Sequence, residues 1–257
     1  MPAHDLDLLI EVARRAGSIA TSFTQDALER WDKPDDAGPV TEADLAVNAM
    51  LEDVLRGARP DYGWLSEESA DSAERLDAEC VFIIDPIDGT RSFIEGSRAW
   101  AHSIAIAEKG VVTAAVVYLP RMDKLYSAAT GQGAFLNDKR ITASAQAAMD
   151  GALVLGAKPT YAPGNWRIPV PKFERSYRPS LAYRLSSVAE GRFDAMLTLR
   201  PTWEWDVAAG DLILREAGAA TSDRRGAPLM FNNPTRQVDG MVAANPVLHR
   251  AITGALA

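Results

Sequence analysis

The chain has 257 residues, of which 47% are hydrophobic and 24% are charged, a composition typical of a globular protein with a substantial core. Its formal net charge of −8 disfavours binding to a nucleic-acid polymer, which needs a surplus of Lys and Arg, although bound divalent cations could still bring a small anion to an acidic site. Cys80 is the only cysteine, the first ten residues do not resemble a signal peptide, and no apolar run approaches the ~20 residues that cross a bilayer. We therefore expect a cytoplasmic protein without a membrane partner.

The first half of the chain carries the periodic patterns of helices and strands. Apolar residues at helical spacing from Leu6 to Phe23 predict a first helix, and the polar stretch from Trp31 to Val40 predicts a loop. Thr41 is the expected N-cap of a second helix, because its hydroxyl can accept a hydrogen bond from an amide of the first turn. The remaining apolar stretches predict strands over residues 62–65, 80–84, 100–108, 111–119 and 124–129.

The second half alternates in the same way. We expect strands over 152–155 and 194–199, an irregular stretch over 158–179, and helices over 180–190 and 205–217. Helices that alternate with strands are typical of a layered α/β protein. A weak boundary near residue 145 divides the chain into an N-terminal α/β half, residues 1–145, and a C-terminal α/β half, residues 146–257.

The sequence Asp85-Pro86-Ile87-Asp88-Gly89-Thr90 follows the predicted strand over 80–84 directly. Carboxylates at such a strand end repel each other unless protons or cations compensate their charge. Oxygen ligands of this kind suit Mg²⁺ or Mn²⁺. Taken alone, however, the same residues are more typical of a simple turn than of a metal site.

Three further acidic segments strengthen the metal-site interpretation. Glu67 and Glu68 follow the strand predicted over 62–65, and Asp44 and Asp206 each lie near the start of a predicted helix. Each has a simpler explanation, namely a solvated loop, a charge that complements the helix dipole, or an N-cap. Their joint occurrence is the informative observation.

Taken in order, the motifs Thr41-x-x-Asp44, Glu67-Glu68-Ser69, Asp85-Pro86-Ile87-Asp88-Gly89-Thr90 and Trp205-Asp206-x-Ala208-Ala209-Gly210 resemble the signature set of the inositol monophosphatase family. The resemblance runs from about Val12 to the C-terminal region, and Lys33 occupies its expected place. It implies an αβαβα sandwich with a metal site at the seam between the halves. It also implies two or three Mg²⁺ ions per site, with Mn²⁺ possible, sensitivity to lithium, a homodimer, and hydrolysis of a small phosphorylated substrate.

The resemblance implies roles for individual residues. Glu67, Asp85 and the Ile87 carbonyl would hold one metal, and a second would be held by Asp85, Asp88 and Asp206. The residues implied in catalysis are Asp44, Thr90 and Glu67, with Asp44 and Thr90 orienting and deprotonating the attacking water. The N-terminal half thus carries most metal ligands, and the C-terminal half carries Asp206 and the substrate specificity.

The residues expected at the substrate are Asp88, Gly89, Thr90, Arg184 and Arg200, with the Gly89 and Thr90 amides around the phosphate. In the family branch that acts on 3′(2′),5′-bisphosphate nucleotides, a basic residue at the position of Arg184 meets the second phosphate, and Tyr183 or Trp203 could stack on a base.

Two positions bear on the substrate itself. Thr198 stands where family members acting on inositol phosphate have a glutamate. Arg91 replaces a common threonine, either as a substrate contact or as an exposed loop residue. We favour a bisphosphate nucleotide as substrate, with inositol 1-phosphate as the alternative and a structural role for Arg184 left open.

Competing classes of protein fit less well. Phosphatases of the haloacid-dehalogenase type need two acids spaced two residues apart, whereas Asp85 and Asp88 are three apart with a proline between them. No Gly-x-x-x-x-Gly-Lys-Ser/Thr loop occurs, which argues against a nucleotide-binding ATPase. A non-catalytic binding module with the same fold is the alternative from another class, and the presence of every expected ligand argues against it.

Overall fold

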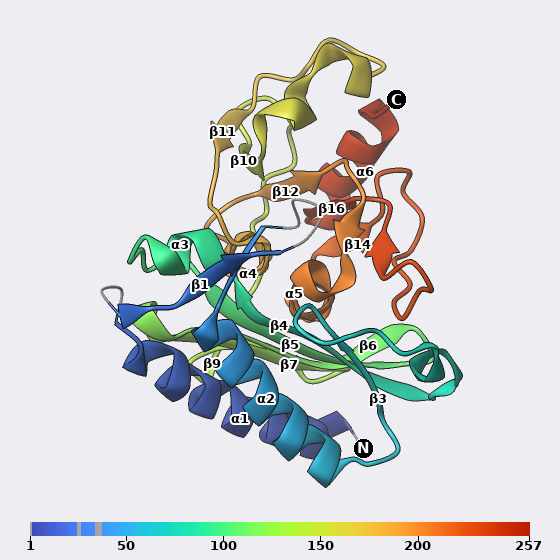
Figure 1. The fold of residues 1–257 in the computed structure, drawn as a ribbon. Helices are drawn as coiled ribbons and strands as arrows, with labels where there is room; N and C mark the ends of the chain where they lie inside the picture. Colours follow the sequence, from blue (N-terminus) through green and yellow to red (C-terminus); the bar gives the residue numbers. More distant parts are fainter. Residues whose placement is uncertain (1, 25–26, 34–37) are drawn as a thin grey trace.

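The computed structural model describes residues 2–24, 27–33 and 38–257, and its chain runs through the layers shown in Figure 1. The helices of the described residues are α1 (Pro2–Ser22), α2 (Glu42–Ala58), α3 (Thr90–Ile94), α4 (Leu181–Ala189), α5 (Glu204–Glu216) and α6 (Pro246–Ala255).

Two sheets make up the strand layers. The larger sheet has the order β3 (Gly63–Ser66), β4 (Cys80–Asp88), β5 (Ala101–Glu108), β6 (Val111–Leu119), β7 (Lys124–Ala129), β8 (Gly133–Leu136) and β9 (Lys139–Arg140). The smaller sheet has the order β11 (Glu174–Ser176), β10 (Leu153–Gly156), β12 (Ala195–Thr198), β16 (Met241–Ala244) and β14 (Ala220–Ser222). Two short ribbons pair β1 (Arg30–Asp32) with β2 (Pro39–Thr41), and β13 (Thr202–Trp203) with β15 (Gln237–Val238).

The larger sheet is buried on both faces because its strands alternate between two apolar cores. On β4, Phe82 and Ile84 join the core beneath α1 and α2, while Val81 and Ile83 join the core on the opposite side. The helix α1 crosses β6 closely, since a Cβ at Gly17 would lie 2.5 Å from the ring of Tyr118.

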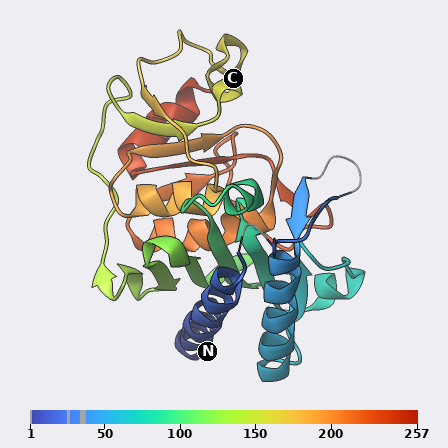
Figure 2. The same ribbon diagram turned by 60° about the vertical axis from the view of Figure 1, so that its left-hand side comes forward.

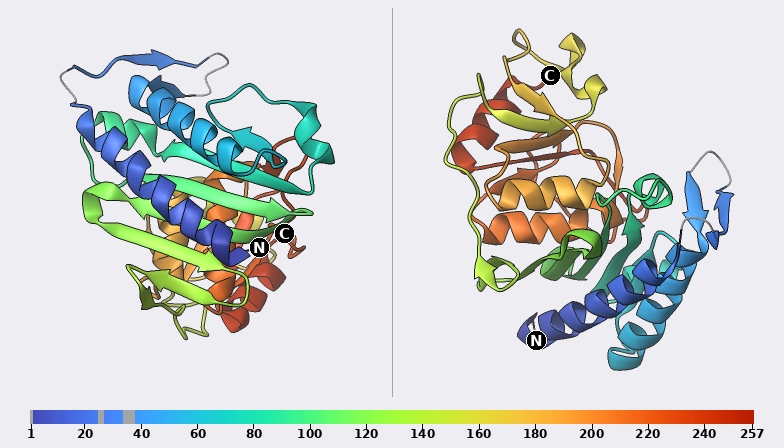
Figure 3. Two further views of the ribbon diagram at one scale, coloured as in Figure 1. Left: turned by 90° about the horizontal axis from the view of Figure 1, so that it is seen from below. Right: turned by 90° about the vertical axis from the view of Figure 1, so that its left-hand side faces the viewer.

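Helices α4 and α5 form the middle layer and contact both sheets (Figure 2). They pack closely at Gly210, where a Cβ would lie 2.4 Å from the Leu185 side chain. Helix α6 covers the far face of the smaller sheet, against β14 and β16 (Figure 3). The order of layers is therefore α, β, α, β, α, which confirms the predicted αβαβα sandwich.

Several expected elements are confirmed. The first helix, the 100–119 hairpin strands and the helices over 180–190 and 205–217 are present to within a few residues. Thr41 is the N-cap of α2 and forms a capping box, in which its side chain accepts from the Asp44 amide while the Asp44 carboxylate accepts from the Thr41 amide. The division of the chain near residue 145 stays a prediction.

Other expectations were wrong in detail. The stretch from Trp31 to Val40 is not wholly a loop, because its ends pair as β1 and β2, and residues 34–37 lie outside the described residues. The strand expected to end at Ile84 continues to Asp88 through a bulge, because Asp88 pairs again with Ala101.

In the C-terminal half, the stretch over 158–179 was expected to be irregular but contains the short strand β11. Helix α5 begins at Glu204 after Trp203, so Asp206 lies in its first turn and is not its N-cap.

The topology brings the ends of three strands to one edge of the smaller sheet. Strands β10, β11 and β12 run parallel, so their carboxyl ends meet at one edge of the smaller sheet. Binding sites in parallel sheets lie at such carboxyl ends.

Among the described helices, none is both long enough and apolar enough to cross a membrane.

Candidate metal centre

A cavity of about 500 Å³ lies where the end of β4, the start of α3 and the start of α5 meet. The predicted site residues that line it are Glu67, Asp85, Ile87, Asp88, Gly89, Thr90, Arg200 and Asp206. The other residues on its wall are Gly38, Pro39, Arg91, Ser92, Tyr177, Pro179 and Trp203. The structure therefore brings eight of the ten predicted residues to one cavity, all except Asp44 and Arg184.

The bulge in β4 accounts for the convergence of Asp85 and Asp88. Asp85 pairs with Ser103 and Asp88 pairs with Ala101, so two residues of β4 lie opposite the single residue His102 of β5. The buried His102 donates a hydrogen bond from Nδ1 to the Pro86 carbonyl oxygen at 2.5 Å. This contact fixes the backbone between the two acids.

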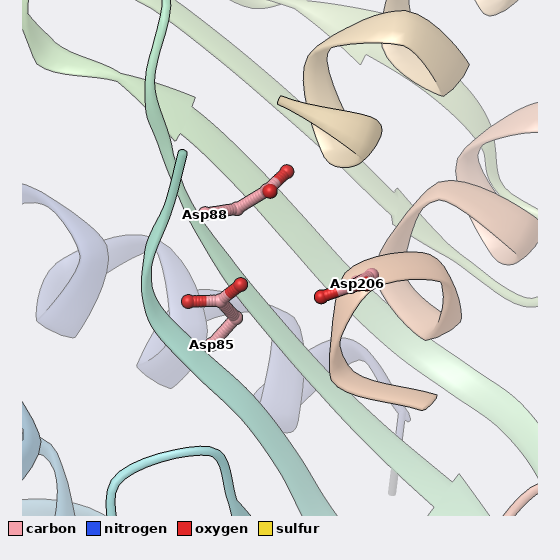
Figure 4. A group of neighbouring side chains, drawn as sticks. All are labelled: Asp85, Asp88 and Asp206. Atoms are coloured by element: carbon pink, nitrogen blue, oxygen red, sulfur yellow. The ribbon is translucent and has the colours of Figure 1, made fainter. Parts of the chain in front are cut away.

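Asp206 reaches the same cavity from the first turn of α5. One carboxylate oxygen from each of Asp85, Asp88 and Asp206 lies within 4.8 Å of the others, and Figure 4 shows the three side chains gathered around one space. Ser103, on the opposite face of β5 from His102, donates its hydroxyl to the Trp205 carbonyl at 2.8 Å. Two neighbouring residues of β5 therefore hold the carbonyl that follows Asp85 and the carbonyl that precedes Asp206.

Burial first, and then the charges of neighbouring acids, raise the pKa values of Asp85 and Asp206. Burial, and then the charges of Glu67 and Asp88, raise the pKa of Asp85 well above its usual value. Burial, followed by Asp88 and Glu67, does the same to the pKa of Asp206. Among the described residues, the buried Asp85 Oδ1 has no hydrogen-bond partner. Crowded carboxylates with an unsatisfied buried oxygen fit a divalent cation, whose charge would compensate them.

Asp88 is held more firmly than its neighbours. Its Oδ2 accepts hydrogen bonds from Ser180 Oγ and from the Ala182 amide, both at 2.6 Å. Burial nevertheless raises the pKa of Asp88 to about 6, against the opposing effect of these two donors. Ser180, the N-cap of α4, thus links that helix to the candidate metal centre, a role that its sequence neighbourhood gave no reason to expect.

Lys33 compensates part of the negative charge. Its Nζ lies 2.7 Å from Glu67 Oε1 and 2.5 Å from Glu68 Oε1. Burial opposes the charge of Lys33, yet Glu67 and Glu68 raise its pKa to about 12. Burial, and then the charge of Glu67, raise the pKa of Glu68 to about 7. The family resemblance predicted the place of Lys33, and the structure adds this pair of contacts.

Asp44 lies behind the cavity and reaches it through Thr90. Thr90 Oγ1 lies 3.3 Å from Asp44 Oδ1 and 3.2 Å from the Ile87 carbonyl oxygen. Burial raises the pKa of Asp44 to about 6, against the two hydrogen bonds from Thr41. Gly89 precedes α3 with φ of 97°, in the left-handed region that favours glycine.

Arg184 lies apart from the cavity lining. It donates to the backbone carbonyls of Arg178 and Pro179, and its guanidinium lies 4.3 Å from the ring centroid of Tyr177. Tyr183 is also buried and accepts a hydrogen bond from Arg192. By contrast, the exposed side chains of Arg91 and Arg200 line the cavity.

Comparisons with known proteins identify the family of this chain. A model of the inositol monophosphatase family matches residues 2–257. The inositol-1-monophosphatase of Mesorhizobium japonicum is 32% identical over 267 residues, which cover 98% of this chain and 95% of that protein. Nus factor SuhB of Escherichia coli K12 is 35% identical over 261 residues, covering 96% of this chain and 93% of that protein.

Among solved structures, the extragenic suppressor protein suhB from Bartonella henselae is similar with a TM-score of 0.81 and 28% identity, over 98% of this chain and 97% of that chain. The sequence motifs, the five-layered fold and the carboxylate-lined cavity all agree with these matches. The chain therefore belongs to the inositol monophosphatase family and is a metal-dependent phosphatase.

Proposed function

We propose that the protein hydrolyses a phosphate monoester of a small metabolite with the help of Mg²⁺ ions and without a covalent phosphoenzyme. The observation that carries this proposal is the convergence of Asp85, Asp88 and Asp206 around one space, with Glu67 on the same cavity wall. Hard carboxylate oxygens and a backbone carbonyl suit Mg²⁺, with Mn²⁺ as a substitute.

The ligands divide between two ions. Glu67, Asp85 and the Ile87 carbonyl would hold one ion, and Asp85, Asp88 and Asp206 would hold the other. When bound, such ions lower the pKa of water and stabilise the charge that develops on the attacking and leaving oxygens. Lys33 would set the position of Glu67 through its 2.7 Å contact.

Thr90 and Asp44 would act on the attacking water. The single Thr90 hydroxyl proton can be donated to Asp44 Oδ1, which leaves the lone pairs of Thr90 Oγ1 to accept a hydrogen bond from the water. As the water gives its proton to Thr90, Thr90 would pass its own proton to Asp44. Asp44 is a suitable final acceptor, because burial raises its pKa to about 6, close to the pH at which a base works well. The amides of Gly89 and Thr90 would contact the phosphate oxygens, because first-turn amides lack intrahelical acceptors.

The substrate that we favour is a 3′(2′),5′-bisphosphate nucleotide. Arg91 and Arg200 place exposed guanidinium groups on the cavity wall, where they suit phosphate oxygens. Tyr177 and Trp203 line the same cavity, so their rings could stack against a nucleobase. Trp203 is itself stacked on Trp205, with ring centroids 4.9 Å apart.

Inositol 1-phosphate is the second candidate. It is favoured by the names of relatives such as the Mesorhizobium inositol-1-monophosphatase. Thr198, which takes the place of the expected glutamate, argues against it, because Thr198 is buried beside the hydroxyl of Thr202 at 3.3 Å and offers no carboxylate to a polyol. The resemblance further supports a cytoplasmic homodimer, which size-exclusion chromatography with light scattering would test.

The test is phosphate release with Mg²⁺ from adenosine 3′,5′-bisphosphate, inositol 1-phosphate and fructose 1,6-bisphosphate, each repeated with EDTA. We expect chelator-sensitive release, fastest from the nucleotide. Faster release from inositol 1-phosphate would favour the second candidate. No release from any compound by a protein that binds Mg²⁺ would favour a non-catalytic role.

A further inference from the structure

A second cavity, of about 430 Å³, adjoins the metal centre. Its lining comprises Gly156, Ala157, Lys158, Tyr161, Arg175, Ser176 and Tyr177. Tyr177 lines both this cavity and the metal-site cavity, so the two cavities meet at this residue. We refer to the second cavity as the outer cavity. It lies at the carboxyl ends of the parallel strands β10 and β11, the edge at which parallel sheets bind ligands.

The floor of the outer cavity is fixed by Tyr161. This residue is buried, and its hydroxyl donates to the Val154 carbonyl at 3.2 Å. Gly156 leaves room for the ring, because a Cβ at that position would lie 2.8 Å from Tyr161 Oη. The guanidinium of Arg175 lies over the ring, 4.4 Å from its centroid. The cation–π contact therefore sets the position of the Arg175 charge.

The positive charges of the outer cavity lack acidic partners. Within the part of the chain that the structure describes, neither Lys158 nor Arg175 forms an ion pair or a side-chain hydrogen bond, and both side chains are exposed. Two unpaired cations beside an aromatic floor form an environment that suits an anionic group.

The wall between the two cavities is held by Arg184. Its guanidinium contacts the ring of Tyr177, and its N–H groups donate to the carbonyls of Arg178 and Pro179. Arg178 in turn donates to the Tyr177 carbonyl at 2.6 Å. These contacts direct two of the Arg184 donors into the wall, so Arg184 positions Tyr177, whereas Lys158 and Arg175 line the outer cavity.

We propose that the outer cavity is a second anion subsite, in which Lys158 and Arg175 bind a second phosphate of a substrate whose scissile phosphate lies in the metal centre. This inference rests on the proposed function and names the feature that selects its substrate. The substrate class is a small organic bisphosphate, and a monophosphate such as inositol 1-phosphate would leave the subsite unused. The second phosphate therefore contributes binding and takes no part in bond breaking.

The test compares neutral variants that keep side-chain bulk, Lys158→Met and Arg175→Leu, singly and together. Lys172→Met is the matched control, since it removes an exposed lysine that lies just before β11 and does not line the outer cavity. Initial rates with Mg²⁺ give KM and kcat for adenosine 3′,5′-bisphosphate and for inositol 1-phosphate.

We expect each variant of the subsite to raise KM for the bisphosphate about tenfold, with kcat unchanged, because each loses one charge-assisted contact. KM for inositol 1-phosphate should stay the same, and Lys172→Met should change neither substrate. Equal changes for both substrates, or none, would overturn the subsite.

The two proposals fail in different ways. Phosphate release from the monophosphate with no effect of the variants on the bisphosphate would remove the subsite and leave the phosphatase intact. Absence of release from both substrates in the unaltered protein would instead contradict the proposed function. In that case, calorimetric titration with the bisphosphate and Mg²⁺ still decides the subsite, which requires weaker binding to Lys158→Met and Arg175→Leu.

Discussion

Asp88→Asn separates the stability of the fold from the chemistry of the site. Asp88 is buried, and its Oδ2 accepts from Ser180 Oγ and from the Ala182 amide at 2.6 Å each. An asparagine has nearly the same shape, and its amide oxygen can accept both hydrogen bonds. The substitution therefore removes a charge from the carboxylate cluster while it preserves the local packing.

The magnitude follows from the pKa of Asp88, which burial raises from 3.8 to about 6. A shift of about two units corresponds to about 3 kcal/mol against the ionised form in the folded, metal-free protein. Between pH 3.8 and about 6, Asp88 keeps its proton in the folded state but loses it in the unfolded state. The free energy of unfolding therefore decreases as pH rises through this range, and above it the full cost of the buried charge applies.

Metal-free Asp88→Asn should therefore be more stable than the unaltered protein by up to about 3 kcal/mol at pH 8. Its melting temperature should be higher by several degrees. The gain should shrink between pH 6 and pH 4, where Asp88 itself becomes protonated. In contrast, kcat/KM with Mg²⁺ should fall at least about 100-fold, because even groups that only support metal ligands contribute about 10–100-fold.

The assay combines thermal unfolding in EDTA, from pH 4 to pH 8, with phosphate release in Mg²⁺. Asp53→Asn is the matched control, because Asp53 is exposed on α2 and should change neither measurement. An Asp88→Asn protein that is less stable than the unaltered chain at pH 8, or one that keeps near-normal activity, would refute the reasoning.

Three further predictions concern the same centre. Thr90→Ala should lower kcat about 100-fold or more, as expected for loss of a water-orienting group, while the Mg²⁺ concentration for half-maximal rate stays nearly constant. A large shift of that Mg²⁺ concentration would contradict the assignment of Thr90 to the water. His102→Leu should raise the half-maximal Mg²⁺ concentration about tenfold and keep kcat at saturating Mg²⁺, because His102 acts on the site through the Pro86 carbonyl. A Mg²⁺ titration with an unchanged midpoint would rule out this supporting role of His102. Mg²⁺ affinity, followed by calorimetry, should fall as pH drops below about 6, since protons compete for Asp88, and a pH-independent affinity would count against a carboxylate site.

Much of the centre was predictable from the order of its motifs. Acids placed directly after apolar strands or at helix starts lie at element ends, where the chain turns and side chains from separate segments can meet. Glu67 and Asp206 were predicted in this way, and both line the same cavity as Asp85. The N-cap at Thr41 was similarly evident, because capping depends only on residues within one turn, while the reciprocal bond from Asp44 was found in the structure.

The supporting contacts were not predictable, because they join residues that are distant in sequence. His102 contacts Pro86 only because the β4 bulge places one residue of β5 opposite two of β4. A histidine within an apolar strand has no local signal for this role. Ser180 and Asp88 are likewise 92 residues apart, and their contact depends on how α4 packs in the middle layer.

The role of Arg184 stays a prediction, because its place in the sequence does not give its hydrogen-bond partners. Arg184 was expected at the second phosphate, with a structural role left open, and two of its donors are directed to the Arg178 and Pro179 carbonyls. Its position in the sequence indicates proximity to the cavity, whereas hydrogen-bond partners decide whether its charge is free. Lys158 lies in a stretch expected to be irregular, and no residue pattern there indicates a cavity.

The central claim is that divalent cations held by the carboxylate cluster are required for phosphate release. The most direct measurement is the initial rate of phosphate release during a Mg²⁺ titration of protein stripped with EDTA, using adenosine 3′,5′-bisphosphate and inositol 1-phosphate, with Asp88→Asn in parallel. We expect no release without Mg²⁺, saturable recovery with Mg²⁺, and little recovery in Asp88→Asn. Full release from the stripped protein, or equal recovery in Asp88→Asn, would contradict the claim.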